Sequence, residues 1–306
     1  MRIKAALVCT ILSPALLALS PPLELQPSSN WVLDYAENSC RLVRLFGEGD
    51  NKSRFALESE APGEMDMLVI GRPFQSHDEQ VSARFIPVQS KPLMGRPARA
   101  TDKGDPAILY PTVDFASQSF IEAAKKEGDE RRAHPDERPP PLDLKEEQRK
   151  KADRQEFASK AVALEIDPRP GHRVILETGP LGEAVRMFDK CSRDSLRDWG
   201  VDPDLEDKIV RPVFASIPPW KWFSPNDYPR DMLAHREESI VKSRLLVDAT
   251  GRVTKCTSLS HFKEAEFNKV VCNIFMSRAH FEPAELADGT KVPSYYVSHV
   301  VFRVAL

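Results

Sequence analysis

The 306-residue sequence lacks the short motifs that assign many proteins to an enzyme class. It has no Gly-x-Ser-x-Gly nucleophile motif, no His-Glu-x-x-His zinc motif, no phosphate-binding P-loop and no dinucleotide fingerprint. Its seven histidines are scattered along the chain. We therefore expect a protein that is not an enzyme, with no catalytic residues, no cofactor and no metal site.

Neither sign of charge dominates, because 43 Lys and Arg residues stand against 46 Asp and Glu residues. A net charge of −3 gives no electrostatic reason to expect a nucleic acid or an anionic membrane surface as partner. Hydrophobic residues make up 41% of the chain, which is enough for a buried core. Partners must therefore be inferred from local features.

Long apolar runs are scarce, and the clearest one lies at the N-terminus. Arg2 and Lys4 precede an uncharged apolar run over residues 5–19, and Ser20 and two prolines follow it. This is the pattern of a signal peptide, and the run is shorter than the roughly 20 residues that span a bilayer. We predict that residues 1–20 are cleaved and that the protein is periplasmic. A retained leader that anchors the protein in the inner membrane is the alternative, and only then do we expect contact with a membrane.

Short Cys-x-x-Cys pairs, which structural zinc sites need, are also absent. Cys9 lies inside the leader, which leaves an even number of cysteines in the mature chain. An oxidising compartment would pair these four, and three pairings are open on paper. The four are Cys40, Cys191, Cys256 and Cys272.

Most of the N-terminal half has the pattern of β-strands. Short apolar runs separated by Gly and Asp turns fill residues 31–71 and continue less clearly to residue 113. A strand is predicted at 174–176, and apolar residues at helical spacing predict a helix from Leu181 to Trp199. We expect an α+β protein whose residues 23–205 form a β-rich domain with one packed helix.

Two segments interrupt this pattern. Residues 122–156 hold ten Lys or Arg residues, eleven Asp or Glu residues and almost no large apolar ones. Such a segment buries little surface, so we expect a solvated helix or a poorly ordered insertion. Residues 206–226 combine four prolines with Trp220 and Trp222, which predicts an extended linker whose tryptophans pack on a neighbouring domain.

The last segment, residues 227–306, has the most specific pattern. A short helix is followed by an alternating strand, a hairpin turn at 248–251, a helix stripe, a second turn and a final strand. Glycine in the hairpin turn supplies the positive φ that such turns need. The residues that mark this order are Tyr228, Pro229, Gly251, Phe281, Pro283 and Ala284.

This order resembles the TonB C-terminal domain, which is a domain of two helices on a three-stranded antiparallel sheet. The resemblance covers about a quarter of the chain, and Ser239 stands where the family usually has glycine. Cys256 and Cys272 resemble the cysteine-bearing variants of the domain. We favour this pair, together with Cys40 and Cys191; the two bridges would contribute about 3 and about 4 to 5 kcal/mol by loop entropy.

Energy transducers of this family use the domain to pair with an extended segment of an outer-membrane receptor. The resemblance therefore implies that the final strand binds an envelope or outer-membrane protein by strand addition, because an exposed edge either needs protection or recruits another strand. The residues of this predicted edge are Tyr295, Tyr296, Val297, Ser298, His299, Val300, Val301, Phe302 and Arg303.

Four alternatives stay open at this stage. The edge pairs with itself in a homodimer, or the N-terminal domain covers it. The protein is a membrane-anchored energy transducer for transport across the outer membrane. Finally, the N-terminal domain houses an enzyme or a binder of small ligands.

Overall fold

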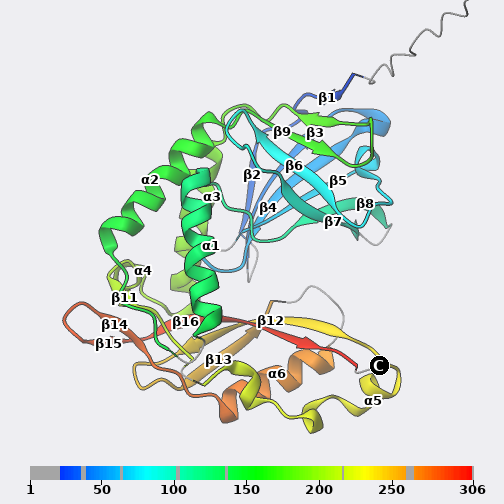
Figure 1. Ribbon diagram of the computed structural model, residues 1–306. Coiled ribbons are helices and arrows are strands. Elements are labelled where there is room, and N and C mark those ends of the chain that lie inside the picture. Colours follow the sequence, from blue (N-terminus) through cyan, green and yellow to red (C-terminus); the bar gives the residue numbers. More distant parts are fainter. Residues whose placement is uncertain are drawn as a thin grey trace, which may run out of the picture.

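The computed structural model describes residues 21–35, 39–62, 65–100, 104–134, 137–215, 217–259 and 265–304. Over these residues the protein is a mixed α+β structure, as the sequence predicts, with one ten-stranded sheet, two three-stranded sheets and six α-helices. The predicted signal peptide, residues 1–20, lies outside the described residues. Figure 1 shows the large sheet above and a smaller unit, built from the C-terminal residues, below it.

The large sheet has the strand order β1-β10-β9-β6-β7-β8-β5-β4-β3-β2. Its neighbours are antiparallel, except that β1 and β10 are parallel. The sheet curls until its two ends come close together. Pro27, just after β1 at one end, forms a β-bridge with Phe46 of β3, the strand next to the other end. The strands are β1 (Leu23–Leu25), β2 (Val32–Tyr35), β3 (Cys40–Phe46), β4 (Ser53–Ser59), β5 (Asp66–Ile70), β6 (Val81–Ile86), β7 (Leu93–Ala100), β8 (Asp105–Tyr110), β9 (Ala163–Asp167) and β10 (Val174–Leu176).

The inner face of this curled sheet carries the larger core. In β3, Cys40, Leu42 and Phe46 are buried while the residues between them are only half-buried, as expected for a strand with one face against the core. Helix α3 (Gly182–Trp199) adds the apolar stripe that the sequence predicts, including Val185 and Phe188. Packing of this helix on the sheet completes one hydrophobic cluster.

The charged segment forms helices, the first of the two expected alternatives, and not a poorly ordered insertion. It folds into α1 (Gln118–Ala133) and α2 (Leu144–Lys160). Opposite charges three or four residues apart form ion pairs on both helices, for example Arg131 with Glu127 at 2.6 Å and Lys160 with Glu156 at 2.5 Å. The near-balance of charge therefore supports helix formation.

Helix α2 also packs against the large sheet, so two helices rather than the predicted one complete the core. Phe157 is 6% exposed and makes edge contacts with Phe85 and Phe115, at ring distances of 6.2 and 5.9 Å. Arg154 then joins α2 to Asp189 of α3 at 2.7 Å. A few residues near the C-terminal end of α2 thus fix an otherwise solvated helix.

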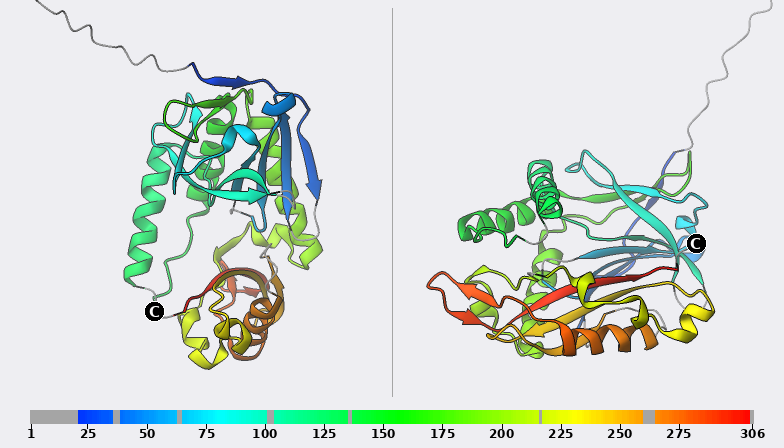
Figure 2. Two further views of the ribbon diagram at one scale, coloured as in Figure 1. Left: turned by 90° about the vertical axis from the view of Figure 1, so that its right-hand side faces the viewer. Right: turned by 60° about the horizontal axis from the view of Figure 1, so that its bottom comes forward.

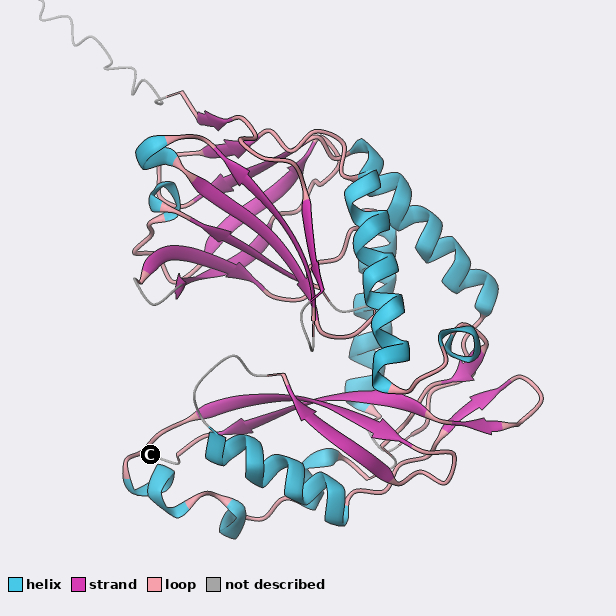
Figure 3. Ribbon diagram, turned by 180° about the vertical axis from the view of Figure 1, so that it is seen from behind, coloured by secondary structure: helices cyan, strands magenta, loops and turns pink. Residues whose placement is uncertain are grey.

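The C-terminal unit has one main sheet in the order β13-β12-β16, all antiparallel. Helix α6 packs on one face of it, and Figures 1 and 3 show β12 and β16 lying between α6 and the part of the molecule that holds the large sheet. The elements are β12 (Ser239–Val247), β13 (Val253–Ser258), β16 (Ser294–Phe302), α5 (Arg230–Ala234), α6 (Ala265–Arg278) and a second small sheet of β11 (Ile209–Arg211), β14 (Ala284–Leu286) and β15 (Lys291–Val292).

The predicted linker over residues 206–226 belongs to this unit, which is a second correction. Strand β11 pairs with β14, and Phe214 forms a bridge with Glu282. Trp222 is 8% exposed and packs on Phe275 and Phe281, whereas Trp220 is exposed. The proline-rich stretch therefore supplies a strand and part of the core, because its apolar residues have partners far along the chain.

The remaining elements are short. Helix α4 (Pro203–Glu206) follows α3 directly, and the 3-10 helices are η1 (Gly49–Asn51), η2 (Arg72–Phe74), η3 (Pro219–Trp222) and η4 (Pro225–Asp227). The two further views in Figure 2 show the C-terminal unit beside one end of the large sheet. Over the described ranges, no helix combines the length and the apolar character that crossing a membrane requires.

Candidate functional site

Like β13, strand β16 is one of the two outer strands of the main C-terminal sheet. It is nine residues long and pairs with β12 along its whole length, from Ser294 opposite Val247 to Phe302 opposite Ser239. Among the described strands it has no neighbour on its other side. Arg303, the last residue of the predicted edge, lies just beyond the strand. An edge of this length extends about 30 Å and directs backbone groups outward at about every second residue.

One face of β16 is fixed by the core beneath it. Phe302 packs on Phe267 of α6 at 4.6 Å, and Tyr296 packs on Phe281 at 4.9 Å. Ser298 is buried and Val300 packs against the same hydrophobic cluster. These contacts hold the strand rigidly, so its outer edge keeps a fixed geometry.

The other face of β16 is partly open. Val301 and the residue opposite it, Ile240 of β12, are 51% and 60% exposed. His299 is exposed and Val297 is half-exposed. At the other end of this face, Tyr295 packs with Trp199 at the end of α3, at a ring distance of 6.1 Å. One end of the strand is therefore anchored to the large domain, and the other end is accessible.

The contact between the two parts of the molecule begins at this anchored end and extends along β12 as far as Lys242, which lies opposite His299. Lys242 of β12 forms an ion pair with buried Glu60 at 2.9 Å, and Arg244 donates to the Glu60 carbonyl at 2.8 Å. The Tyr295 hydroxyl donates to the carbonyl of Pro62 at 3.2 Å. The guanidinium of Arg244 lies 3.4 Å from the ring centre of Trp199, a cation–π contact.

Burial perturbs two ionisable groups at this contact. Removal from water lowers the pKa of Arg244 to about 10, so the side chain stays charged at neutral pH. Burial raises the pKa of Glu206, and a hydrogen bond from the Ser294 hydroxyl, at 2.7 Å, partly opposes that rise. Both shifts show that burial disfavours the charged form of these side chains, so the hydrogen bonds and the cation–π contact around them offset part of the cost of removing charge from water.

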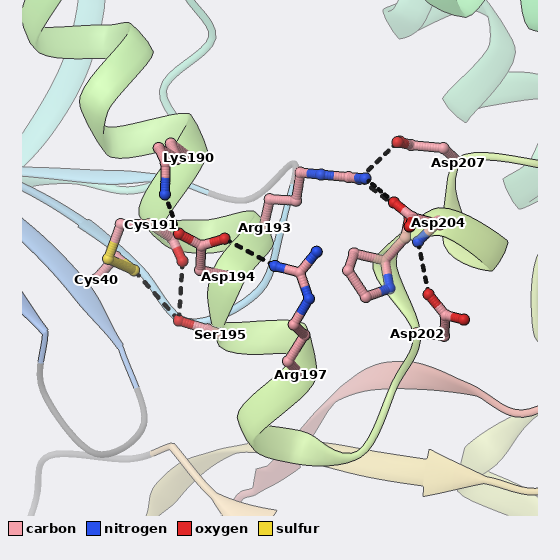
Figure 4. A network of polar contacts seen from close by, with 11 residues as sticks. Cys40, Lys190, Cys191, Arg193, Asp194, Ser195, Arg197, Asp202, Asp204 and Asp207 are labelled. Atoms are coloured by element: carbon pink, nitrogen blue, oxygen red, sulfur yellow. Dashed lines mark hydrogen bonds and ion pairs between the residues drawn. A yellow bond between two sulfur atoms is a disulfide. The ribbon is translucent and has the colours of Figure 1, made fainter.

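The link between α3 and α4 is also held by charge, as Figure 4 shows. Arg193 of α3 binds Asp204 at 2.7 Å and Asp207 at 2.5 Å, and it donates to the carbonyl of Pro203 at 3.0 Å. These three contacts fix the direction in which the chain leaves α3. The C-terminal unit therefore has a defined position relative to the large sheet.

The connection between α1 and α2 braces the C-terminal unit from a second side. Arg138 forms an ion pair with Glu282 at 2.8 Å and donates to the carbonyl of Pro283 at 3.1 Å. The amide of Leu142 donates to the carbonyl of Val210 in β11 at 2.6 Å. The charged segment thus contacts the turn that precedes β14, which sequence reasoning did not predict.

The family-motif residues lie in two places. Gly251 is hydrogen-bonded through its carbonyl to the amide of Phe281 at 2.8 Å, and Phe281 leads through Pro283 to buried Ala284. Tyr228 packs on Phe302 at 5.3 Å and donates from its hydroxyl to the Glu237 carbonyl at 2.5 Å. Pro229 directly precedes α5. These residues form the core and turns that support β16.

Cysteines 40, 191, 256 and 272 form two disulfides in the pairing that the sequence favours. Cys40 bonds Cys191, with a Cα–Cα distance of 6.0 Å, and this β3–α3 disulfide is buried. Cys256 bonds Cys272 at a Cα–Cα distance of 5.5 Å, and we name it the β13–α6 disulfide. Each bridge ties a helix to its own sheet. In the described part of the chain, no group of three or more His, Cys, Asp and Glu side chains is placed to hold a metal ion.

No family model matches this sequence, and no curated protein matches it either.

Proposed function

We propose that the protein is a periplasmic interaction module whose strand β16 recruits an extended segment of an envelope protein by strand addition. The observation that carries the proposal is the position of β16 as a nine-residue outer strand with a neighbour on one side only, among the described strands. The proposal also rests on the resemblance of residues 227–306 to the TonB C-terminal domain. The two disulfides are compatible with an oxidising compartment such as the periplasm.

Several physical features support strand addition at this edge. Strand β16 is rigid because its inner face packs on α6. Binding would therefore cost the conformational entropy of the incoming segment but not that of the edge itself. Main-chain hydrogen bonds would supply affinity, and the side chains that alternate along the edge would supply specificity. The exposed pair Ile240 and Val301 offers apolar area next to the accessible end.

Site-specific photocrosslinking in the periplasm tests the proposal. A photoreactive residue replaces His299 or Val301 on β16, and a matched control replaces Met276 on α6, which is 47% exposed against 51% for Val301. We expect adducts with an envelope protein from the two β16 positions and none from position 276. Equal adducts from all three positions would mean that capture does not involve the edge.

The same experiment separates strand addition from its alternatives. Adducts of twice the protein's own mass and no others would show that the edge pairs with a second copy in a homodimer. Crosslinks only to the large domain of the same chain would show that the edge is covered. Either result would contradict recruitment of a separate envelope protein.

A further inference from the structure

Four segments of the large domain meet at one end of the sheet and line a small open hollow. The start of β1, the 3-10 helices η1 and η2, and the turn between β9 and β10 supply its walls, and its volume is about 280 Å³. It lies in the large domain and contains no residue of β16. We call it the arginine hollow after its four basic lining residues, which are Arg72, Arg169, His172 and Arg173.

The charges around the arginine hollow do not cancel. Its one acidic lining residue, Asp50, pairs with Arg72 at 2.8 Å, and both side chains are mostly exposed to water. Arg173 reaches buried Glu165 at 3.3 Å, but Arg84 binds the same carboxylate more closely, through its Nε at 2.7 Å. Glu165 is therefore shared by two guanidinium groups, and positive charge remains.

Two lining residues have no side-chain partner among the described residues. Arg169 and His172 stand at the two ends of one tight turn, in which the His172 amide donates to the Arg169 carbonyl at 3.1 Å. Both side chains are exposed, and neither makes a hydrogen bond or ion pair through its side chain within the described part of the chain. Their donors are therefore available to a ligand.

These features fit one class of ligand. A guanidinium group offers a planar fork of N–H donors that matches two phosphate oxygens, and imidazole can donate a hydrogen bond in either protonation state. A phosphate group is anionic at pH 7, with a charge of about −1.5 to −2 in a monoester and a smaller one in a diester such as a phospholipid headgroup, and either complements the excess positive charge. We propose that the arginine hollow binds a phosphate-bearing anion through Arg169, His172 and Arg173. Leu23 and Val174 line the same hollow and provide an apolar wall for the remainder of an ester.

Two probes test the proposal on the full chain. Inorganic phosphate is titrated while the amide signals of residues 169–174 are followed by NMR, and binding to phosphatidylglycerol vesicles is compared with binding to phosphatidylcholine vesicles. A response to inorganic phosphate assigns the hollow to free anions. Preference for phosphatidylglycerol vesicles without that response assigns it to a lipid headgroup.

The double variant Arg169→Gln with His172→Gln should bind the effective probe about tenfold more weakly, which corresponds to about 1.4 kcal/mol. Its thermal midpoint should stay unchanged, because both replaced side chains are exposed. The control Arg186→Gln removes an exposed arginine of α3 and should leave binding unchanged. Binding of neither probe by the parent protein, or equally tight binding by the double variant, would overturn the proposal. None of these outcomes bears on β16.

Discussion

The hairpin turn between β12 and β13 offers a sharp test of how the C-terminal unit is held together. Gly251 has a φ of +87°, and a Cβ atom added there would lie 1.9 Å from the carbonyl oxygen of Phe281. Gly289 in the turn between β14 and β15 has a nearly identical φ of +85°, but an added Cβ meets nothing within 4 Å. The two glycines therefore have nearly the same φ and differ in the space around them.

The Gly289→Ala substitution should lower the free energy of unfolding only by the cost of placing an L-residue at positive φ, about 1 to 2 kcal/mol. The Gly251→Ala substitution should lower the free energy of unfolding by that amount and more. The backbone of Phe281 must move, which breaks the hydrogen bond to Gly251, worth about 1 kcal/mol. The move also disturbs the ring contacts of Phe281 with Trp222 and Tyr296, each worth about 0.5 to 1.5 kcal/mol. We expect a total loss of about 4 kcal/mol.

Urea unfolding at equilibrium measures both variants against the parent protein. The predicted result is a difference of about 2 to 3 kcal/mol in the free energy of unfolding between them, with similar dependence on urea concentration. Equal losses for Gly251→Ala and Gly289→Ala would refute the reasoning, because the contact between the hairpin and Phe281 would then contribute nothing measurable.

Two further predictions follow from the covalent and ionic contacts. Replacing both cysteines of the β3–α3 disulfide with alanine should lower the free energy of unfolding by about 5 kcal/mol, and the same change at the β13–α6 disulfide by about 3 kcal/mol, because the sequence separations are 151 and 16 residues. Urea midpoints in the opposite order would contradict this. The pKa of Asp227 is lowered from 3.8 to about 2, mainly by a hydrogen bond from Arg278. The stability that this carboxylate adds is therefore present above pH 3.8 and is lost as the pH falls towards 2. The Asp227→Asn variant should lack that part of the acid-induced loss, and thermal midpoints measured from pH 5 to pH 2 would show whether the two proteins differ in this way.

Local chemistry made part of the structure predictable. The stripe from Leu181 to Trp199 predicts a helix because its apolar residues recur at helical spacing, and the structure has α3 over Gly182–Trp199. The turn at Gly251 predicts the β12–β13 hairpin because few other residues tolerate positive φ there. Both features depend on residues that are neighbours in the sequence.

Contacts between distant segments explain what the sequence did not reveal. Lys242 and Arg244 lie on the face of β12 opposite Val241 and Leu245, where a charged residue is usually solvated, yet they bind Glu60. Trp222 reads as part of a linker because the strand before it is short and its partner strand β14 follows much later. The arginine hollow is built from four separate segments of the chain, which no local pattern brings together.

Residue-resolved amide hydrogen exchange along β16 tests the central claim most directly. In the free protein, amides of residues 294–302 that donate to β12 should be protected, and the alternate amides that point outward should exchange rapidly. Addition of the envelope protein captured from positions 299 and 301 should protect the outward-pointing amides and leave the others unchanged. Protection of every amide in the free protein, or no change in the outward-pointing ones when the captured protein is bound, would contradict strand addition at this edge.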